Sequence, residues 1–318
     1  MSVVRPRGWL GWWPASLGGR VGLAMLVLIA LPCVATAPWS VGRYAQERLG
    51  QEWSEVGPSM AEPMGTDRLG RSLLWRCALG GAISLGVGIA AAGIAVGIGT
   101  AWGMTAGFAG GRVDSAMMRS VDVLYGLPYI LLVVLMNVAF RPFIEGLMTW
   151  VTGSAMAGSI ANVVTLLLAI GAVSWLTMAR VVRGQTLSLR NQPFVEAARC
   201  AGVPAHRILL RHVLPNLAGP IIVYATLAIP QAILQESFLS FLGIGIQAPV
   251  PSWGNLAAEG TEQFTTLIIN PAGVRWWLLA FPCLLLSLTL LGLNLFGDDL
   301  RDRLDPRAQG SAAHRASS

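Results

Sequence analysis

Six long apolar runs, separated by segments that carry most of the charged and turn-forming residues, dominate the hydropathy pattern of the chain. Each run has about the 20 residues that a helix needs to cross a membrane. The predicted spans cover residues 21–39, 80–105, 121–140, 160–178, 218–242 and 276–296. Pro128 and Pro230 fall inside the third and fifth runs, where proline is expected to kink a helix. The pattern predicts an all-α integral membrane protein with six transmembrane helices.

The first run also has features of a cleavable signal peptide. Arg5 and Arg7 precede it, and residues 35–37 at its end form an A-x-A pattern. Pro38 directly follows that pattern, and the basic region before the run is long. These two features favour an uncleaved membrane anchor.

The distribution of arginine predicts the orientation of the spans. Lysine is absent, and the chain has 22 arginines. With the N-terminus inside the cell, 15 of them fall on inner segments, where positive charge collects in membrane proteins. The other seven are Arg43, Arg48, Arg68, Arg71, Arg76, Arg141 and Arg275. The bias predicts that both termini are cytoplasmic.

The spans and this orientation divide the chain into five segments. They are a cytoplasmic N-terminal segment (1–20), a first transmembrane helix (21–39), an extracytoplasmic segment (40–79), a core transmembrane domain (80–297) with a cytoplasmic loop (180–215), and a cytoplasmic tail (298–318). The second span carries glycines at 93, 97, 99, 103 and 107 in small-x3-small patterns. Such patterns predict close packing of helices in lipid.

The composition excludes a soluble domain. The chain is 54% hydrophobic and 12% charged, whereas a soluble domain has about 25% charged residues. The mean hydropathy is +0.61. The basic pI, about 9.8, would suit a nucleic-acid partner. However, the arginines are spread between apolar spans, which membrane topology explains, so no nucleic-acid partner is expected.

Several kinds of chemistry are excluded by what the chain lacks. Without lysine it has neither the phosphate-binding residue of a P-loop nor a Schiff-base nucleophile. The cysteines form no CxxC pair or disulfide framework, and the histidines lack nearby carboxylates or thiols for a metal site. These residues are Cys33, Cys77, Cys200, Cys283, His206, His212 and His314. We therefore expect no catalytic residue, cofactor or metal in this chain.

The predicted loop 180–215 has the pattern of two short helices. Residues 191–193, Asn-Gln-Pro, are typical of a helix start. Phe194, Ala197, Ala198 and Ala201 then form one small apolar face at helical spacing. Residues 202–204, Gly-Val-Pro, are expected to end that helix. A second helix is expected from Ala205, carrying Arg207 and Arg211 one turn apart and ending near Pro215. Such a unit either docks into a groove of another protein, lies on the membrane surface or serves as a spacer.

Four stretches of the sequence carry a resemblance. Residues Glu196-Ala197-Ala198, Gly202 and Leu214-Pro215 match the pattern EAA-x3-G-x9-I-x-L-P, with His212 at the isoleucine position. The others are Gly-Thr-Asp-Arg-Leu-Gly-Arg at 65–71, Arg-Val-Val-Arg-Gly-Gln at 180–185, and Ser-Phe-Leu-Ser-Phe-Leu-Gly-Ile-Gly at 237–245 with Pro-Ser-Trp-Gly at 251–254. Over residues 21–306 the chain resembles the permease subunits of ATP-binding-cassette (ABC) importers of the dipeptide, oligopeptide and nickel family. It is most similar to the C-type subunit.

The resemblance implies a type I ABC-importer permease fold and a non-catalytic transport subunit. It further implies a homologous second permease, two cytoplasmic ATPase subunits that bind ATP and Mg, and an extracytoplasmic binding protein, all in a bacterial cytoplasmic membrane. Peptides are the expected cargo, with nickel chelates, glutathione or another small solute as the alternative. The implied ATPase-coupling residues are Glu196, Ala197, Ala198, Ala201, Gly202, Arg207, Arg211, Leu214 and Pro215.

The chain departs from the family pattern at three places. Glu62 stands where the family often has histidine, and Ser72 replaces the aspartate that closes the element at 65–71. The outer stretch 141–159 is longer than usual. These departures leave the class of the protein intact and affect the expected substrate and outer-face contacts.

Glu236 is the candidate for a gate or for contact with a peptide amino group. A carboxylate deep in an apolar run is costly and is therefore a functional candidate, although it can also accept hydrogen bonds from a neighbouring helix or reach the interface. Asp114 and Asp122 are expected to be ion partners of nearby arginines, and Trp253 to anchor a loop at the membrane surface. An ion-driven secondary transporter or an intramembrane enzyme would need several polar residues within the membrane. The predicted spans contain Glu236 as an isolated candidate, so these two classes are disfavoured.

Overall fold

The computed structural model describes Pro14 and residues 16–47, 54–152, 157–267 and 275–304. Within that part of the chain, six helices are long and apolar enough to cross a membrane, which confirms the predicted number of spans. They are α1 (Leu17–Arg43), α2 (Leu73–Ala109), α4 (Tyr129–Thr152), α5 (Ala157–Arg190), α8 (Leu214–Phe241) and α10 (Trp277–Leu304). The cytoplasmic segment expected at 1–20 and the tail expected at 298–318 fall largely outside the described residues.

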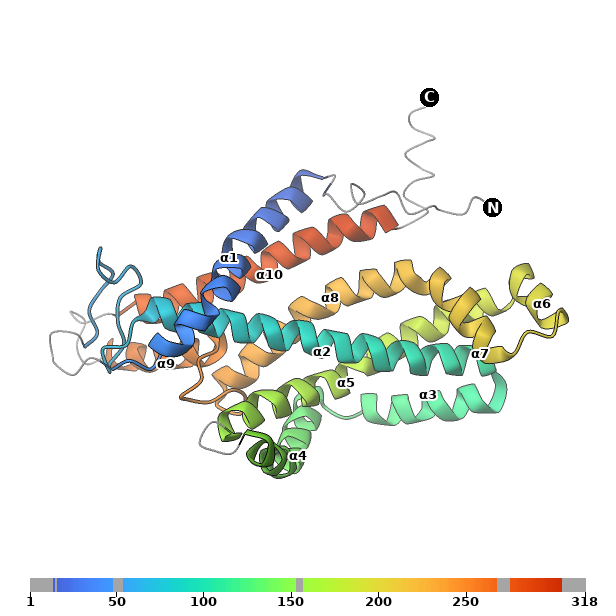
Figure 1. Ribbon diagram of the computed structural model, residues 1–318, viewed down its shortest axis with the longest axis horizontal. Helices are drawn as coiled ribbons and strands as arrows, with labels where there is room; N and C mark the ends of the chain where they lie inside the picture. The colour runs from blue at the N-terminus through green and yellow to red at the C-terminus, as the bar shows by residue number, and fades with distance from the viewer. Residues whose placement is uncertain (1–13, 15, 48–53, 153–156, 268–274, 305–318) are drawn as a thin grey trace.

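Shorter helices lie at the two ends of this bundle. They are α3 (Gly111–Tyr125), α6 (Pro193–Cys200), α7 (Ala205–Ile208), the π-helical turn η2 (Leu209–Val213) and α9 (Trp253–Leu267). In Figure 1, α9 lies at one end of the molecule and α6 and α7 lie at the other. We refer to these as the α9 end and the α6 end.

Helices α2 and α5 pack together more extensively than any other pair of helices. Their seam depends on three glycines of the second span, Gly99, Gly103 and Gly107. A Cβ at Gly103 would lie 2.3 Å from the Ala179 carbonyl oxygen, and one at Gly107 would lie 2.8 Å from that of Arg183. Any side chain would therefore push the two backbones apart, as the small-x3-small pattern predicts. Gly93 and Gly97, in contrast, have open space at the Cβ position and take no part in the seam.

Helices α1 and α10 form an antiparallel pair. The backbone N–H of Ser16 donates to the Asp299 carboxylate at 2.8 Å, and Arg303 pairs with the same carboxylate at 2.9 Å. The charged sequence after the last predicted span therefore continues α10 as far as Leu304. Asp299 is buried in this contact with α1.

The position predicted for the third span is wrong. The helical stretch beginning at Gly111 ends at Tyr125, and a new helix, α4, begins after Pro128. Since a residue that precedes proline is disfavoured in the α conformation, Leu127 interrupts the helix where a kink was expected. The membrane-length helix is α4, so residues 141–152, predicted to lie outside the membrane, continue it.

Two further predictions fail in the second half of the chain. The short helix expected to end near Pro215 instead runs through η2 into α8, and Pro215 occupies the first turn of α8, where its missing N–H is tolerated. Trp253 does not anchor a surface loop but is completely buried. Its ring lies against Gly81, and its indole N–H donates to the Cys77 carbonyl at 3.1 Å.

Candidate functional site

The inner face of the α6 loop is fixed to the membrane helices by buried apolar side chains. Val195 on α6, Ile208 on α7 and Val213 on η2 pack into one cluster with Met104 of α2 and Val182 of α5. All of these side chains are buried. Burial of a side chain such as valine or isoleucine stabilises a contact by about 1.5–3 kcal/mol, so the loop is firmly attached to α2, α5 and α8.

The outer face of the same loop is exposed. Phe194, Ala197 and Ala201 are exposed, whereas Ala198 is half-buried against the apolar cluster beneath the loop. The small apolar face predicted from the sequence is therefore mostly accessible. Of the other predicted coupling residues, Leu214 is half-buried, and those that are exposed are Glu196, Gly202, Arg207, Arg211 and Pro215.

Gly202 makes the turn between α6 and α7. Its φ is +73°, in the left-handed region that favours glycine, and a Cβ there would meet no other atom within 4 Å. The expectation of a turn at Gly202 is therefore confirmed, and the backbone conformation rather than crowding requires glycine. Its N–H donates to the Arg199 carbonyl at 2.9 Å, which closes the end of α6.

Arginines connect this loop to the ends of α2 and α3. The Arg199 guanidinium lies 4.8 Å from the centroid of the Phe108 ring, a cation–π contact between α6 and α2. On α5, Arg183 makes two hydrogen bonds of 2.6 Å to the Asp114 carboxylate on α3. These bonds lower the pKa of Asp114 below its ordinary value. Arg180 pairs with Asp122 at 2.8 Å, so both aspartates are ion partners, as predicted.

A cavity of about 430 Å3 lies between α2, α5, α8 and the segment that joins α3 to α4. Its polar lining residues are Tyr125, Tyr129, Ser174, Thr177, Tyr224, Gln231 and Gln235, and none of its lining residues is charged. The Tyr129 hydroxyl donates to the side-chain oxygen of Gln235, which joins α4 to α8. The sequence did contain a signal for this site, since Gln231 and Gln235 stand one helical turn apart in an apolar run, but our sequence analysis missed it.

Glu236 lies next to Gln235 but does not line this cavity. Its side chain is fully buried, and the Ser240 and Ser237 hydroxyls donate to it at 2.7 and 3.3 Å. Ser84 and Ser252 also hydrogen-bond to the carboxyl group. The structure thus surrounds Glu236 with hydroxyl groups where α2 and α8 meet the start of α9. Its role in a gate remains a prediction.

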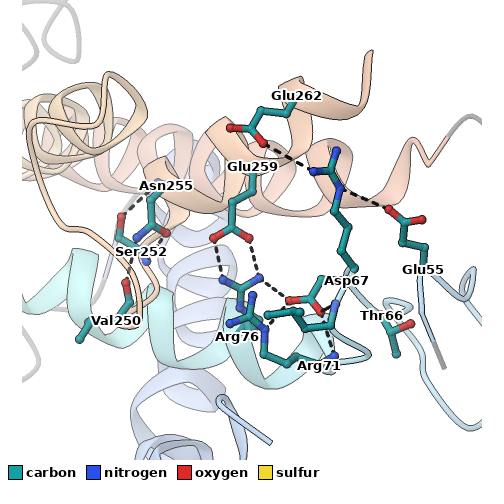
Figure 2. A network of polar contacts seen from close by, with 12 residues as sticks. Glu55, Thr66, Asp67, Arg71, Arg76, Val250, Ser252, Asn255, Glu259 and Glu262 are labelled. Carbon is teal, nitrogen blue, oxygen red and sulfur yellow. Dashed lines mark hydrogen bonds and ion pairs between the residues drawn. The ribbon is translucent and has the colours of Figure 1, made fainter. Parts of the chain in front are cut away.

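A network of ion pairs occupies the α9 end (Figure 2). Arg76 is 2% exposed and makes two hydrogen bonds to Glu259, at 2.6 and 2.8 Å, and a third of 2.8 Å to Asp67. The Asp67 carboxylate also accepts the backbone N–H groups of Leu69 and Arg71, each at 2.9 Å. The element at 65–71 therefore forms a turn around Asp67 and ties the start of α2 to α9.

Two departures from the family pattern lie in contact at this end. The Ser72 hydroxyl donates to the Glu62 carboxylate at 2.6 Å, and both side chains are buried. The positions at which the resemblance leads to histidine and aspartate thus hold a hydrogen-bonded acidic and hydroxyl pair. Both departures are visible in the sequence, whereas the contact between them is not.

Among the residues that the structure describes, no three histidine, cysteine, aspartate or glutamate side chains come together in a way that could bind a metal ion. The polar groups of the cavity are hydroxyls and amides. Such an arrangement is suited to hydrogen bonding a ligand rather than to acid–base or nucleophilic chemistry.

Comparison with known proteins gives a consistent result. Residues 99–310 match the family described as "Binding-protein-dependent transport system inner membrane component". The oligopeptide transport system permease protein OppC of Haemophilus influenzae is 41% identical over 292 residues, which cover 91% of this chain and 85% of that protein. The dipeptide transport system permease protein DppC of Bacillus subtilis is 43% identical over 292 residues, covering 92% and 82%. OppC of Escherichia coli K12 is 43% identical over 287 residues, covering 90% and 85%.

The fold is also shared with a solved transporter. A chain from the inward-facing structures of the MetNI methionine ABC transporter superposes with a TM-score of 0.51 and 18% identity, covering 73% of this chain and 98% of that one. The superposition shows the type I importer fold expected from the sequence. The family match over residues 99–310, together with the relatives of 41–43% identity, shows that the chain belongs to the binding-protein-dependent transport system inner membrane components, the permease subunits of ABC importers.

Proposed function

We propose that this permease forms part of the translocation pathway for dipeptides and oligopeptides. As a family member it is a multi-pass protein of the bacterial inner membrane, and nucleotide is bound by partner ATPase subunits rather than by this chain. Relatives that match it along more than four fifths of their length are named as peptide permeases. The observation that carries the mechanism is the α6 loop, whose inner face is packed on the membrane helices while its apolar outer face is exposed.

The exposed face of α6 is proposed to dock into a cleft of an ATPase subunit. Phe194, Ala197 and Ala201 would fill the cleft, and the small alanines allow close approach. Glu196, Arg207 and Arg211 would flank the contact. When ATP closes the ATPase dimer, α6 moves with it, and Val195 and Ile208 pass the displacement to α2, α5 and α8. Because these helices line the cavity, its access changes from one side of the membrane to the other.

The complete importer is proposed to contain a homologous second permease, two ATPases and an extracytoplasmic binding protein. The cavity opens at the surface of this chain, and α4 beside it exposes apolar side chains such as Leu131, Leu135 and Val138. A second permease would close the pathway on this side. At the opposite end of the molecule, the α9 end would face the binding protein.

In the proposed importer, both termini and α6 are cytoplasmic. Cys200 tests the orientation because it is exposed on α6. In a variant that retains Cys200 as its single cysteine, a membrane-impermeant thiol reagent should label the protein after permeabilisation of the cells and spare it before. Labelling in intact cells would contradict the orientation.

Deleting the gene tests the cargo. The deletion strain should lose growth on a peptide that is its sole source of a required amino acid, while the free amino acid still restores growth. Nickel chelates, glutathione and related solutes are the alternative cargo. Unchanged peptide uptake with loss of one of these solutes would overturn the peptide assignment and retain the importer class.

A further inference from the structure

The cavity combines a membrane setting with an uncharged polar lining. Three of the chain's four tyrosines, Tyr125, Tyr129 and Tyr224, line it together with Gln231 and Gln235. Polar side chains within membrane helices are costly unless they face the protein interior or a water-filled path. The volume of about 430 Å3 lies within the range of about 300–1,000 Å3 typical of ligand sites. The lining therefore has the chemistry of a ligand site.

We propose that this cavity binds the backbone of the peptide in transit through neutral hydrogen-bonding side chains, with Tyr129 and Gln235 as the residues that determine specificity for the amide groups. The proposal rests on the peptide function proposed above and specifies which part of the peptide is recognised. Backbone amides are common to all peptides, so such a site recognises a peptide without selecting its side chains.

The two glutamines stand on a face of α8 that differs from its packed face. Gln231 is exposed and Gln235 half-buried, and both line the cavity, whereas Ala232 and Glu236 are buried against the rest of the bundle. Since residues four apart lie on one side of a helix, Gln231 and Gln235 present two amides in a row along the pathway. An amide both donates and accepts hydrogen bonds, as a peptide group does.

Tyr129 and Gln235 already make the kind of contact that a peptide would replace. The hydroxyl of Tyr129 on α4 donates to the Gln235 side-chain oxygen on α8. The bond uses that oxygen and leaves the amide N–H groups of Gln235 for a carbonyl of the ligand. A passing peptide N–H can in turn replace the tyrosine hydroxyl as the donor. Exchange of equivalent hydrogen bonds lets the peptide bind without leaving a buried polar group unpaired.

The absence of charge in the lining has a consequence for selectivity. A charged side chain in a low-dielectric wall would attract peptides of one sign and repel those of the other. The guanidinium of Arg180, which pairs with Asp122, packs over the ring of Tyr125, and neither charged residue lines the cavity. We therefore expect anionic, neutral and cationic peptides to pass this permease at similar rates.

The test uses the complete importer in proteoliposomes and two labelled tripeptides that differ by one N-methyl group on a backbone amide. Tyr129→Phe and Gln235→Leu should each lower uptake of the unmethylated peptide by about three- to tenfold, as loss of one hydrogen bond predicts, and should shrink its advantage over the methylated one. Tyr44→Phe and Gln46→Leu are matched controls, because these residues lie outside the cavity, and they should leave uptake unchanged.

A second variant keeps the proposal falsifiable if these substitutions reduce the amount of folded protein. Gln231→Glu places a charge in the cavity at an exposed position. It should make uptake of a lysine-centred tripeptide exceed that of a glutamate-centred one by roughly fivefold or more, where the wild type transports both alike. The inference would be overturned if Tyr129→Phe and Gln235→Leu still discriminated between methylated and unmethylated peptides as the wild type does. It would also be overturned if Gln231→Glu transported the lysine-centred and glutamate-centred tripeptides alike. A wild-type complex that imports no peptide would overturn the proposed function and this inference with it.

Discussion

The two ends of this permease are stabilised by different kinds of interaction. At the α9 end, the buried Arg76 pairs with the buried Asp67 and with Glu259, whose side chain is 41% exposed. At the α6 end, a loop rests on apolar side chains and exposes its outer surface. The network resists movement because displacing Arg76 or Asp67 leaves a buried charge with one partner fewer. The apolar contacts of α6 are not directional and tolerate small shifts. The α9 end is thus suited to being a fixed platform and the α6 end to receiving a displacement.

The strongest test of the fixed platform is Arg76→Met. This substitution removes the shared partner of Asp67 and Glu259, although Asp67 keeps Arg71, and should cost about 3 kcal/mol. Thermal unfolding of the purified complex in detergent would measure the loss. Arg68→Met is the control, because the Arg68 side chain is 56% exposed and surface pairs contribute about 0–1 kcal/mol. Equal effects of the two substitutions would show that the platform does not depend on the buried network.

The pair of family departures at this end offers a second test. Ser72→Asp alone places a carboxylate against that of Glu62 and should destabilise the protein by about 1–3 kcal/mol. Adding Glu62→His supplies the partner expected in the family and should recover most of that loss. A double-mutant cycle, read by thermal unfolding, would measure the coupling. Additive effects of the two substitutions would mean that the two positions changed independently.

The loop at the α6 end is tested by Gly202→Val. Valine at a φ of +73° is strained by about 1–2 kcal/mol, so the turn that presents α6 should shift while the membrane helices remain in place. We expect normal insertion, weaker co-purification with the ATPase subunits and loss of ligand-stimulated ATP hydrolysis. Gly184→Val is the control, since that glycine also has open space at its Cβ but lies within α5.

Glu196→Arg examines charge at the same contact and should weaken ATPase association. Full transport by both Gly202→Val and Glu196→Arg would exclude this loop as the coupling element.

The smallest expected effect concerns pH and the ion pair between Asp114 and Arg183. Because hydrogen bonds from Arg183 lower the pKa of Asp114, the pair stabilises the protein above the ordinary carboxyl pKa of about 4, and this stabilisation is lost as the pH falls through the lowered value. The melting temperature of wild type should exceed that of Asp114→Asn at neutral pH, and the gap should narrow below about pH 4. Asp122→Asn, at a more exposed pair, should change stability less. A gap that is independent of pH would contradict this account.

The structural features that were predicted correctly from the amino-acid sequence depend on local patterns. The number of spans follows from apolar length, and the helix start at Pro193 and the turn at Gly202 follow from single-residue backbone preferences. The failures depend on tertiary contacts. Trp253 has the composition of an interfacial anchor, but Gly81 creates the space that buries it. The third span was misplaced because α3 is amphipathic and its apolar residues merge with those of α4 in the sequence.

Within the candidate sites, sequence identified the outer face of α6 but missed what holds it. Val195 has no distinguishing mark in the sequence, and its burial follows from the placement of α2 and α5 beneath it. The cavity was missed because four separate segments of the chain form it, and in the sequence only the spacing of Gln231 and Gln235 points to it. Glu236 attracted attention as a lone carboxylate, whereas its serine partners are distributed over the chain and could not be paired with it from sequence.

The π-helical turn η2 has a consequence for the evolution of the loop. A π turn holds one more residue than an α turn does, and such a turn typically marks an insertion retained for function. The wider turn takes up this residue with little net rotation, so α6 faces nearly the way that a regular helix between α7 and α8 would present it. Loss of the residue from a turn that stayed α-helical would instead rotate everything before it by roughly 100°. The π turn therefore lets the loop differ in length by one residue while α6 keeps its orientation on the membrane helices.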